Sequence, residues 1–173
     1  TARRKPEIVQ TEKVQLLATE GKGDPNAPAF AEKVGALYKA AYTIKFKYKA
    51  LGKDFIVPKL EALWWFDGEK LPMEEAPLKI PRSEWHYKLL LRMPDFVKQV
   101  DPPIQLIEMH EGRCAQVLHV GPFEKEPETL KLLAAFMSEQ NLQHNGLHHE
   151  NYLSDFRKTA PEKLRTILRE PVK

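Results

Sequence analysis

The segment around residues 148–152 brings together three side chains that can carry out acid–base chemistry. It reads His-His-Glu-Asn-Tyr, and in an extended strand the side chains at alternate positions lie on one face. His148, Glu150 and Tyr152 therefore share a face, while His149 lies on the other. If the shared face lines a cavity, the chain carries an acid–base pair there, because a carboxyl group buried without a cation can act as an acid or base near neutral pH.

Glu150 also has simpler interpretations, which the sequence leaves open. An acid in an otherwise apolar strand can be exposed at an edge, or it can be buried in an ion pair. Arg92 and Arg157 are the candidate partners for such a pair.

The nearby histidines do not predict a metal site. His148 and His149 are adjacent, so they point to opposite faces of a strand, and Asn145-Gly146 breaks any helix that would align His144 with His148. The sequence also lacks a glycine-rich phosphate loop and a dinucleotide-binding fingerprint. We therefore expect neither a metal nor a cofactor.

Other reactive or charged residues have structural interpretations. We interpret Cys114 as a small core residue and His119, in the same predicted strand, as a hydrogen-bonded structural histidine. A solvated surface is the simplest interpretation of the basic residues near the C-terminus, which are Arg157, Lys158, Lys163, Arg165 and Arg169.

Composition is that of an ordinary globular domain, which we expect to cover residues 1–173. The chain has 42% hydrophobic and 29% charged residues, with a net charge of +3. The small charge and the absence of a helix-turn-helix segment argue against direct nucleic-acid binding. One cysteine and no apolar run of about 20 residues argue against a disulfide framework and a membrane span, so we expect a cytoplasmic location.

Two similar units, each a strand, a helix and two further strands, account for the periodicity of the chain. They cover about 12–97 and 104–172. The first has a strand at 14–19, a helix at 30–51 and strands at 59–66 and 84–93, with a loop at 69–82. The second has a strand at 113–120, a helix at 127–140, a strand around 148–152 and a strand at 164–169. A helix is also possible after Thr159, where the Thr and Glu spacing is that of a capping box.

This layout predicts an α+β fold with helices on one face of a sheet and a groove where the two units meet. In the strand 59–66, alternation assigns Trp64 to the core and leaves Glu61 and Trp65 for the groove. In the strand 84–93, Trp85, Tyr87 and Met93 share a face. The opposite face of that strand is predicted to meet solvent and carries His86, Lys88, Leu90 and Arg92.

Four ordered motifs give the chain a specific resemblance to a known family. They are VPKLEALWW at 57–65, WHYKLLLRMPDFV at 85–97, EGRCAQVLHVGP at 111–122 and the segment from HHE to PV at 148–172. Together they resemble the GyrI-like small-molecule-binding proteins over most of the chain. The resemblance implies the duplicated strand-helix-strand-strand fold, also called the SOUL or effector-binding-domain fold, and a central ligand groove with an acid at the position of Glu150.

The paired tryptophans and the HHE motif are similar to one branch of this family, the cyclopropanoid cyclopropyl hydrolases. That branch detoxifies DNA-alkylating compounds of the yatakemycin and CC-1065 class through an aromatic cage. The resemblance implies Glu150 and Tyr152 as catalytic residues. Tyr87 stands where tryptophan is common, and Phe123 replaces the usual tyrosine. The residues that we expect to bind the ligand are Trp65, Trp85, Tyr87, Glu61, Met93, Phe123, Tyr42 and His148.

Three functions therefore compete. The first is a hydrolase that acts on bulky planar electrophiles, with the carbonyl held by Tyr152 or a protonated Glu150 and water oriented by an ionised Glu150. The second is a passive binder that sequesters hydrophobic drugs, with Glu150 as counter-ion and aromatic rings for stacking. The third is a modulator of DNA gyrase, as the family name suggests. In each case we expect a planar hydrophobic ligand or an unknown protein partner, with no membrane partner.

Overall fold

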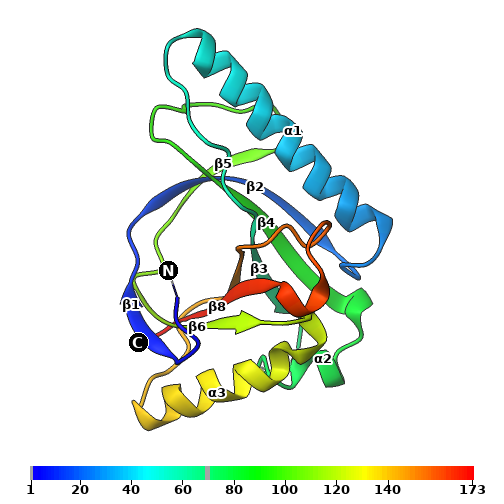
Figure 1. Cartoon of the computed structure of the whole chain (residues 1–173), viewed down its shortest axis with the longest axis vertical. Helices are drawn as coiled ribbons and strands as arrows, with labels where there is room; N and C mark the ends of the chain where they lie inside the picture. The colour runs from blue at the N-terminus through cyan, green and yellow to red at the C-terminus, as the bar shows by residue number, and fades with distance from the viewer. Residues whose placement is uncertain (1, 69–70) are drawn as a thin grey trace.

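The computed structural model describes residues 2–68 and 71–173, and its centre is a single antiparallel sheet (Figure 1). Within those residues the sheet has eight strands in the order β1-β6-β8-β7-β3-β4-β2-β5. The strands are β1 (Glu7–Gln10), β2 (Val14–Lys22), β3 (Glu61–Phe66), β4 (Trp85–Met93), β5 (Gln105–Met109), β6 (Arg113–Val120), β7 (His148–Tyr152) and β8 (Arg165–Pro171).

The duplicated architecture is visible in the strand order. The helices α1 (Pro28–Ala50) and α3 (Glu126–Glu139) each follow the first strand of a unit, so one unit is β2-α1-β3-β4 and the other is β6-α3-β7-β8. In both units the last strand lies between the other two, and the units join through the antiparallel pair β3 and β7. The α+β fold with two strand-helix-strand-strand units, predicted from the sequence, is confirmed.

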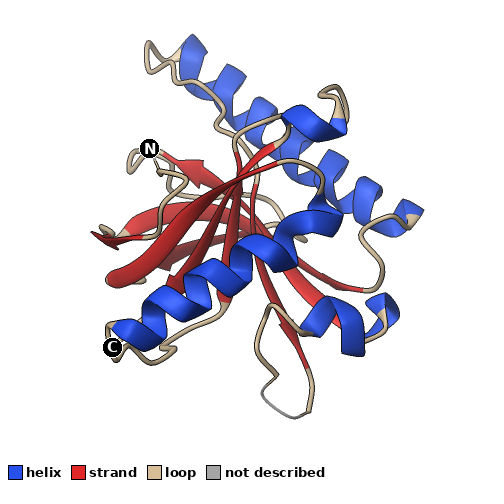
Figure 2. Cartoon of the chain, turned by 60° about the horizontal axis from the view of Figure 1, so that its bottom comes forward, coloured by secondary structure: helices blue, strands red, loops and turns tan. Residues whose placement is uncertain are grey.

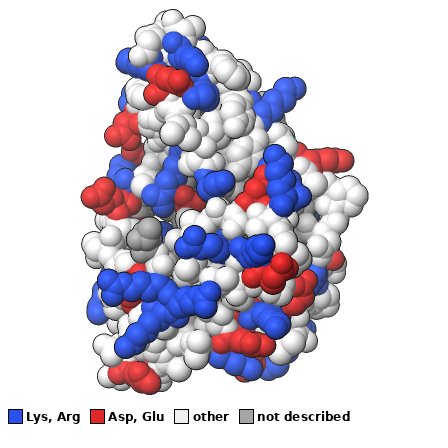
Figure 3. All heavy atoms as spheres, viewed as in Figure 1, with Lys and Arg blue, Asp and Glu red and all other residues white. Residues whose placement is uncertain are grey.

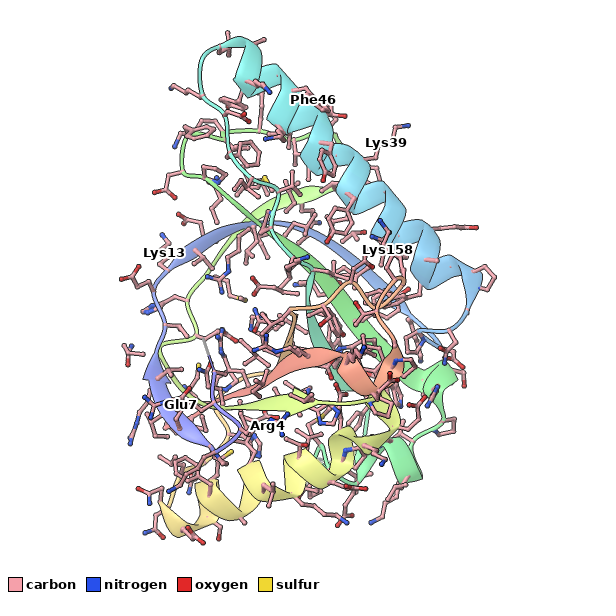
Figure 4. The ribbon with its side chains drawn as sticks, viewed as in Figure 1. Arg4, Glu7, Lys13, Lys39, Phe46 and Lys158 are labelled. Carbon is pink, nitrogen blue, oxygen red and sulfur yellow. The ribbon has the colours of Figure 1, made fainter. Side chains whose placement is uncertain are left out.

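Both long helices pack on the same face of the sheet, as Figure 2 shows from below. Each begins with a proline in its first turn, where a missing N–H costs no helical hydrogen bond. The buried residues of α1 recur every three or four positions, which gives the helix one apolar stripe: Phe30, Val34, Leu37, Ala41 and Ile44. The opposite side of α1 faces outward, where Phe46 is 61% exposed (Figure 4).

The two helices cover two separate parts of the core. The stripe of α1 packs on β2, β3 and β4, where Leu17, Ala62 and Leu89 are fully or almost fully buried. On α3, Leu130, Leu133 and Met137 pack on residues of β6 and β8. The space between the two helices, over β3 and β7, is where a groove can open.

The other face of the sheet is partly covered, which corrects two predictions. Leu90 is fully buried against Leu16 and Leu63 and does not meet solvent. Arg169, expected on a solvated surface, is buried, and its guanidinium binds Glu111 and Gln116. Leu90 differs from the expectation because β2 and β5 supply apolar side chains to this face, and Arg169 differs because Glu111 and Gln116 bind it there. Periodicity within one strand cannot reveal either set of neighbours.

Several boundaries differ from the sequence predictions. The segment predicted as a loop contains the short helix α2 (Ala76–Lys79) and the 3-10 turn η1 (Arg82–Glu84), and its residues 69 and 70 lie outside the described residues. A second 3-10 turn, η2 (Phe123–Lys125), leads into α3. The expected capping box gives only the 3-10 turn η3 (Pro161–Lys163) without a side-chain cap, and the chain then continues as β8, the alternative that we preferred.

Charged side chains of both signs are interspersed over the face shown in Figure 3. Among the helices of the described residues, none is long and apolar enough to cross a membrane.

Candidate functional site

A pocket of about 380 Å³ opens between the two helices, on the face of the sheet that they cover. Pockets of this size hold small organic ligands. It lies over the junction of the two units, since β3 and β7 both contribute to its floor. The first turns of α1 and α3 and the segment containing α2 supply the walls. The lining residues are Pro25, Asn26, Phe30, Trp64, Trp65, Phe66, Met73, Ala76, Pro77, Leu78, Arg82, Trp85, Phe123, Glu124, Glu126, Pro127, Leu130, His148, Glu150, Tyr152 and Phe156.

One aromatic group lines the pocket on the side of the first unit. The ring of Trp64 stacks with Phe30 at a centroid distance of 6.0 Å and meets Trp85 edge-on at 5.9 Å. Tyr87 lies behind them, 5.7 Å from Trp64, and is almost fully buried. These contacts fix the indole planes, so the wall is rigid and apolar.

A second aromatic group faces it from the other unit. The rings of Phe123, Tyr152 and Phe156 contact one another edge-on at centroid distances of 5.7 to 6.2 Å. Phe156 comes from the loop between β7 and η3, which packs against α1 through the guanidinium of Arg157 over the ring of Tyr38. The neighbouring Lys158 lies beside α1 in Figure 4.

A hydrogen-bonded relay crosses the floor of the pocket. The indole N–H of Trp64 donates to the Tyr152 hydroxyl (3.1 Å), which donates to Oε2 of Glu150 (2.6 Å). The other carboxyl oxygen of Glu150 lies 3.2 Å from Nε2 of His148, and Nδ1 of His148 lies 2.5 Å from Glu170 on β8. Glu150 is therefore held at both oxygens, and its orientation is fixed.

Electrostatics keep His148 positively charged. Burial opposes its charge, but the carboxylates of Glu170 and Glu150 outweigh burial and raise the pKa of His148 to about 10. The imidazolium in turn lowers the pKa of Glu170 to about 2, against the effect of its own burial. Both ring nitrogens of His148 thus donate at neutral pH. Burial and the charge of Glu150 raise the pKa of Tyr152 well above its ordinary value, so its hydroxyl keeps its proton.

The sequence-predicted site residues divide into two sets. Glu150, Tyr152 and His148 line the pocket together with Trp65, Trp85 and Phe123. The other four do not line it: Tyr87 and Met93 are buried in the core, Glu61 lies on the opposite face of the sheet, and Tyr42 is half-exposed on α1. Glu61 there binds Arg92 and His149, and burial is outweighed by these cations, which lower the pKa of Glu61 to about 2.

Of the two adjacent tryptophans, Trp64 is buried in the core, as predicted, but it also lines the pocket. Trp64, assigned to the core, pairs across β3 and β7 with His148, so its ring lies on the same face as Glu150. Trp65 borders the pocket, but its ring stacks on that of His86. The sequence prediction placed core and groove on opposite faces of the sheet, whereas the pocket opens within the helix-covered face that also carries the core.

The pocket residues that the sequence analysis did not assign to the site include Trp64, Glu126 and Phe156. Trp64 was detectable, since antiparallel pairing of its strand with the HHE strand would place it beside His148. Glu126 precedes a proline at the start of α3, a position that reads as an ordinary first-turn acid. Phe156 lies in a loop, where neither strand nor helix periodicity can indicate which way a side chain points. The opposite orientations predicted for His148 and His149 are confirmed: His148 binds Glu170, and His149 binds Glu111 on the other face.

Two structural interpretations of reactive residues are also confirmed. Cys114 is fully buried, and burial raises the pKa of its thiol to about 11. The ring nitrogens of His119 lie 2.8 Å from the Thr129 hydroxyl and 3.1 Å from the Pro122 carbonyl oxygen. Neither residue lines the pocket.

Comparison with known proteins identifies the family to which this fold belongs. Residues 4–173 match the family model described as the GyrI-like small molecule binding domain. The chain belongs to the GyrI-like family. The floor, walls and relay described above are thus those of a GyrI-like small-molecule-binding domain.

Solved structures of similar proteins agree with this assignment. The GyrI-like chain is 36% identical to an uncharacterized conserved protein from Listeria innocua, with a TM-score of 0.88 over 99% of this chain and 94% of the other. It is 34% identical to a hydrolase from Listeria innocua, with a TM-score of 0.83 over 100% and 94% of the two chains. The C-terminal domain of EcmrR shares the fold alone, at 9% identity and a TM-score of 0.70 over 98% and 97%. No curated protein sequence matches the chain.

Proposed function

We propose that this protein binds a bulky, planar, hydrophobic molecule between its two aromatic groups and hydrolyses the cyclopropane ring of cyclopropanoid DNA-alkylating agents, a detoxification of the yatakemycin and CC-1065 class. One observation carries the proposal: Glu150 is fixed by hydrogen bonds at both carboxyl oxygens on the floor of an aromatic-walled pocket. The relative from Listeria innocua that is called a hydrolase, 34% identical over the whole chain, supports an enzymatic activity.

The geometry suits a reaction in which water opens a strained ring. The flat substrate would stack against Trp64 and Trp85 on one side and Phe123 on the other, which places its reacting carbon near Glu150. Glu150 would orient a water molecule and accept its proton as the carbon–oxygen bond forms. The cyclopropane carbon–carbon bond then breaks, and its electrons move into the conjugated carbonyl, which becomes a phenol oxygen.

The relay behind Glu150 supports this role. Because Glu170 holds His148 as an imidazolium, the positive charge beside Glu150 is fixed before the substrate binds. The same charge disfavours the alternative in which Glu150 serves as counter-ion for a cationic drug, since the carboxylate already has a cationic neighbour.

The experiment follows the dienone absorbance of a cyclopropane-bearing alkylator in the presence of substoichiometric protein. We expect many turnovers per protein molecule in the wild type. Glu150→Gln keeps the size of the side chain but removes the base, so we expect the rate to fall by about 100-fold or more. Glu162→Gln, an exposed acid on η3, is the matched control and should turn over like the wild type.

Two results would contradict the proposal. Depletion of the alkylator that stops at one equivalent would identify a sequestering protein instead of an enzyme. Wild-type turnover by Glu150→Gln would remove Glu150 from the reaction.

A further inference from the structure

Glu126 places a second carboxyl group in the pocket, and the scheme above does not use it. It is the first residue of α3, is only 8% exposed and lines the pocket together with Glu150. Its Oε1 atom is buried and has no hydrogen-bond partner among the described residues. A buried polar atom without a partner costs stability, so its retention beside a ligand pocket points to a partner that arrives with the ligand.

The surroundings of Glu126 favour its neutral form. Burial is the main cause that raises the pKa of Glu126 well above its ordinary value, and the nearby charge of Glu150 acts in the same direction. The charge of His148 and the neighbouring Thr166 hydroxyl oppose this rise without cancelling it. The two carboxyl groups therefore have different surroundings: Glu150 accepts hydrogen bonds from its neighbours, whereas burial favours the neutral form of Glu126.

We propose that Glu126 is the proton donor of this pocket: its carboxylic acid donates a hydrogen bond to the carbonyl oxygen of the bound ligand and, during hydrolysis, transfers the proton to that oxygen. The inference rests on the proposed function and assigns the acid that the scheme lacked. Tyr152 is a poor candidate for this step, because its hydroxyl already donates to Glu150 at 2.6 Å.

The step balances without a further reagent. Water supplies the oxygen that forms the new carbon–oxygen bond, and Glu150 takes the proton that this water loses. The electron pair of the breaking cyclopropane bond reaches the carbonyl oxygen, which receives the proton of Glu126 and becomes a phenol. Afterwards Glu126 is an anion and Glu150 an acid, and one proton passed from Glu150 to Glu126 through solvent restores the resting state.

The protonation of Glu126 can be measured without any substrate. Infrared spectra of the wild-type protein at neutral pH should show the carbonyl band of a protonated carboxylic acid. Glu126→Gln should lack the band, whereas the control Glu128→Gln, an exposed acid two residues further along α3, should keep it. A wild-type spectrum without the band would overturn the proposal, and so would a band that survives in Glu126→Gln.

Kinetics test the transfer itself. The amide of Glu126→Gln still donates a hydrogen bond but has no proton to transfer, so we expect ligand affinity within about tenfold of the wild type. The single-turnover rate should fall by about 100-fold or more. In the wild type the rate should also fall at alkaline pH, where Glu126 loses its proton, and this pH dependence should be absent in Glu126→Gln. Glu128→Gln should keep both the rate and the pH profile. A rate in Glu126→Gln equal to that of the wild type would overturn the assignment.

A third measurement separates this inference from the proposed function. Binding of a cyclopropane-bearing ligand with an isotope-labelled carbonyl should shift its stretching band to lower frequency in the wild type and not in Glu126→Leu. If the wild type shows this shift but no turnover, the hydrolase function fails while the hydrogen bond from Glu126 stands. If turnover occurs without the shift, the hydrolase function stands and the role of Glu126 fails.

Discussion

His148 determines the electrostatic character of the pocket floor, and Glu170 determines the charge of His148. The two side chains come from neighbouring strands, β7 and β8, and their contact is fully shielded from solvent. In the absence of the Glu170 carboxylate, only Glu150 would oppose the effect of burial on the pKa of His148. The charge beside Glu150 therefore depends on a residue that does not line the pocket.

Replacing Glu170 should change the titration of His148. In Glu170→Gln we expect the pKa of His148 to fall from about 10 toward or below its ordinary value, because the largest charge that raises it is gone. Nuclear magnetic resonance of the imidazole ring measures this directly, with Glu162→Gln as the matched control. A wild-type His148 that loses its proton below pH 8 would contradict the prediction.

For individual residues, alternation along one strand predicted only part of the site. It placed Glu150 and Tyr152 on one face, and the structure joins them by a hydrogen bond. It could not find Glu170 or Glu126, because their contacts with the site depend on strand pairing and on the docking of α3. Those contacts join residues far apart in the sequence, and no local pattern encodes them.

Among the elements, the ring of Tyr87 on β4 lies so close to the backbone of β2 that one position of β2 must be glycine. Gly21 on β2 lies directly opposite Tyr87 on β4. A Cβ atom at this position would come within 2.4 Å of the tyrosine ring, which is buried behind Trp64. The glycine thus lets Tyr87 lie flat against the backbone and support the aromatic wall.

Gly21→Ala should therefore destabilise the protein, and Gly35→Ala should not. We expect Gly21→Ala to lower the free energy of unfolding by roughly 1–3 kcal/mol, the usual cost of overpacking a core. Gly35 lies in α1 with open space around it, so alanine there should raise the free energy of unfolding by roughly 0.5–1 kcal/mol. Urea denaturation of both variants measures the difference, and equal stabilities would refute the packing argument.

The long elements were predictable because each carries a clear period. The helices α1 and α3 and the strands β4 and β6 lie within a few residues of their predicted positions. The short edge strands β1 and β5 were not predicted, since four or five residues give too little periodicity. The short helix α2, in a proline-rich segment, was missed for the same reason.

For the molecule as a whole, the buried ionisable groups predict how stability depends on pH. The folded-state pKa of His148 is raised from 6.5 to about 10, so its stabilisation is complete below pH 6.5 and is lost as the pH rises through 10. Glu126, with a raised pKa, also stabilises less as the pH rises above 4.5. Glu170 and Glu61 have pKa values lowered from 4.5 to about 2, so their stabilisation is lost as the pH falls from 4.5 through 2.

We therefore expect the greatest stability on the acid side of neutrality, with a decline toward pH 10 and a second decline below pH 4.5. Urea denaturation across this range measures both. Glu170→Gln should flatten the decline between pH 6.5 and 10, because His148 no longer gains its charge, while Glu162→Gln should leave it unchanged. A wild-type stability that increases from pH 7 to pH 10 would contradict the prediction.

The architecture of the whole molecule was predictable from the sequence, but the face of the sheet on which the pocket opens was not. Two similar units in sequence implied two similar units in space and a groove at their junction, and the pair β3 and β7 forms that junction. The groove lies within the helix-covered face because α1 and α3 each cover only their own unit and leave the middle strands open. How far apart two helices dock is a property of packing and not of periodicity.

The contact between Trp64 and Tyr152 also gives the protein an internal optical reporter. All three tryptophans line the pocket, the rings of Trp64 and Trp85 are 5.9 Å apart, and the indole N–H of Trp64 is held by Tyr152. Indole emission responds to the polarity and hydrogen bonding around the ring, and both change when a planar ligand replaces water there. Unlabelled protein will therefore signal the filling and emptying of its own pocket through its ultraviolet fluorescence.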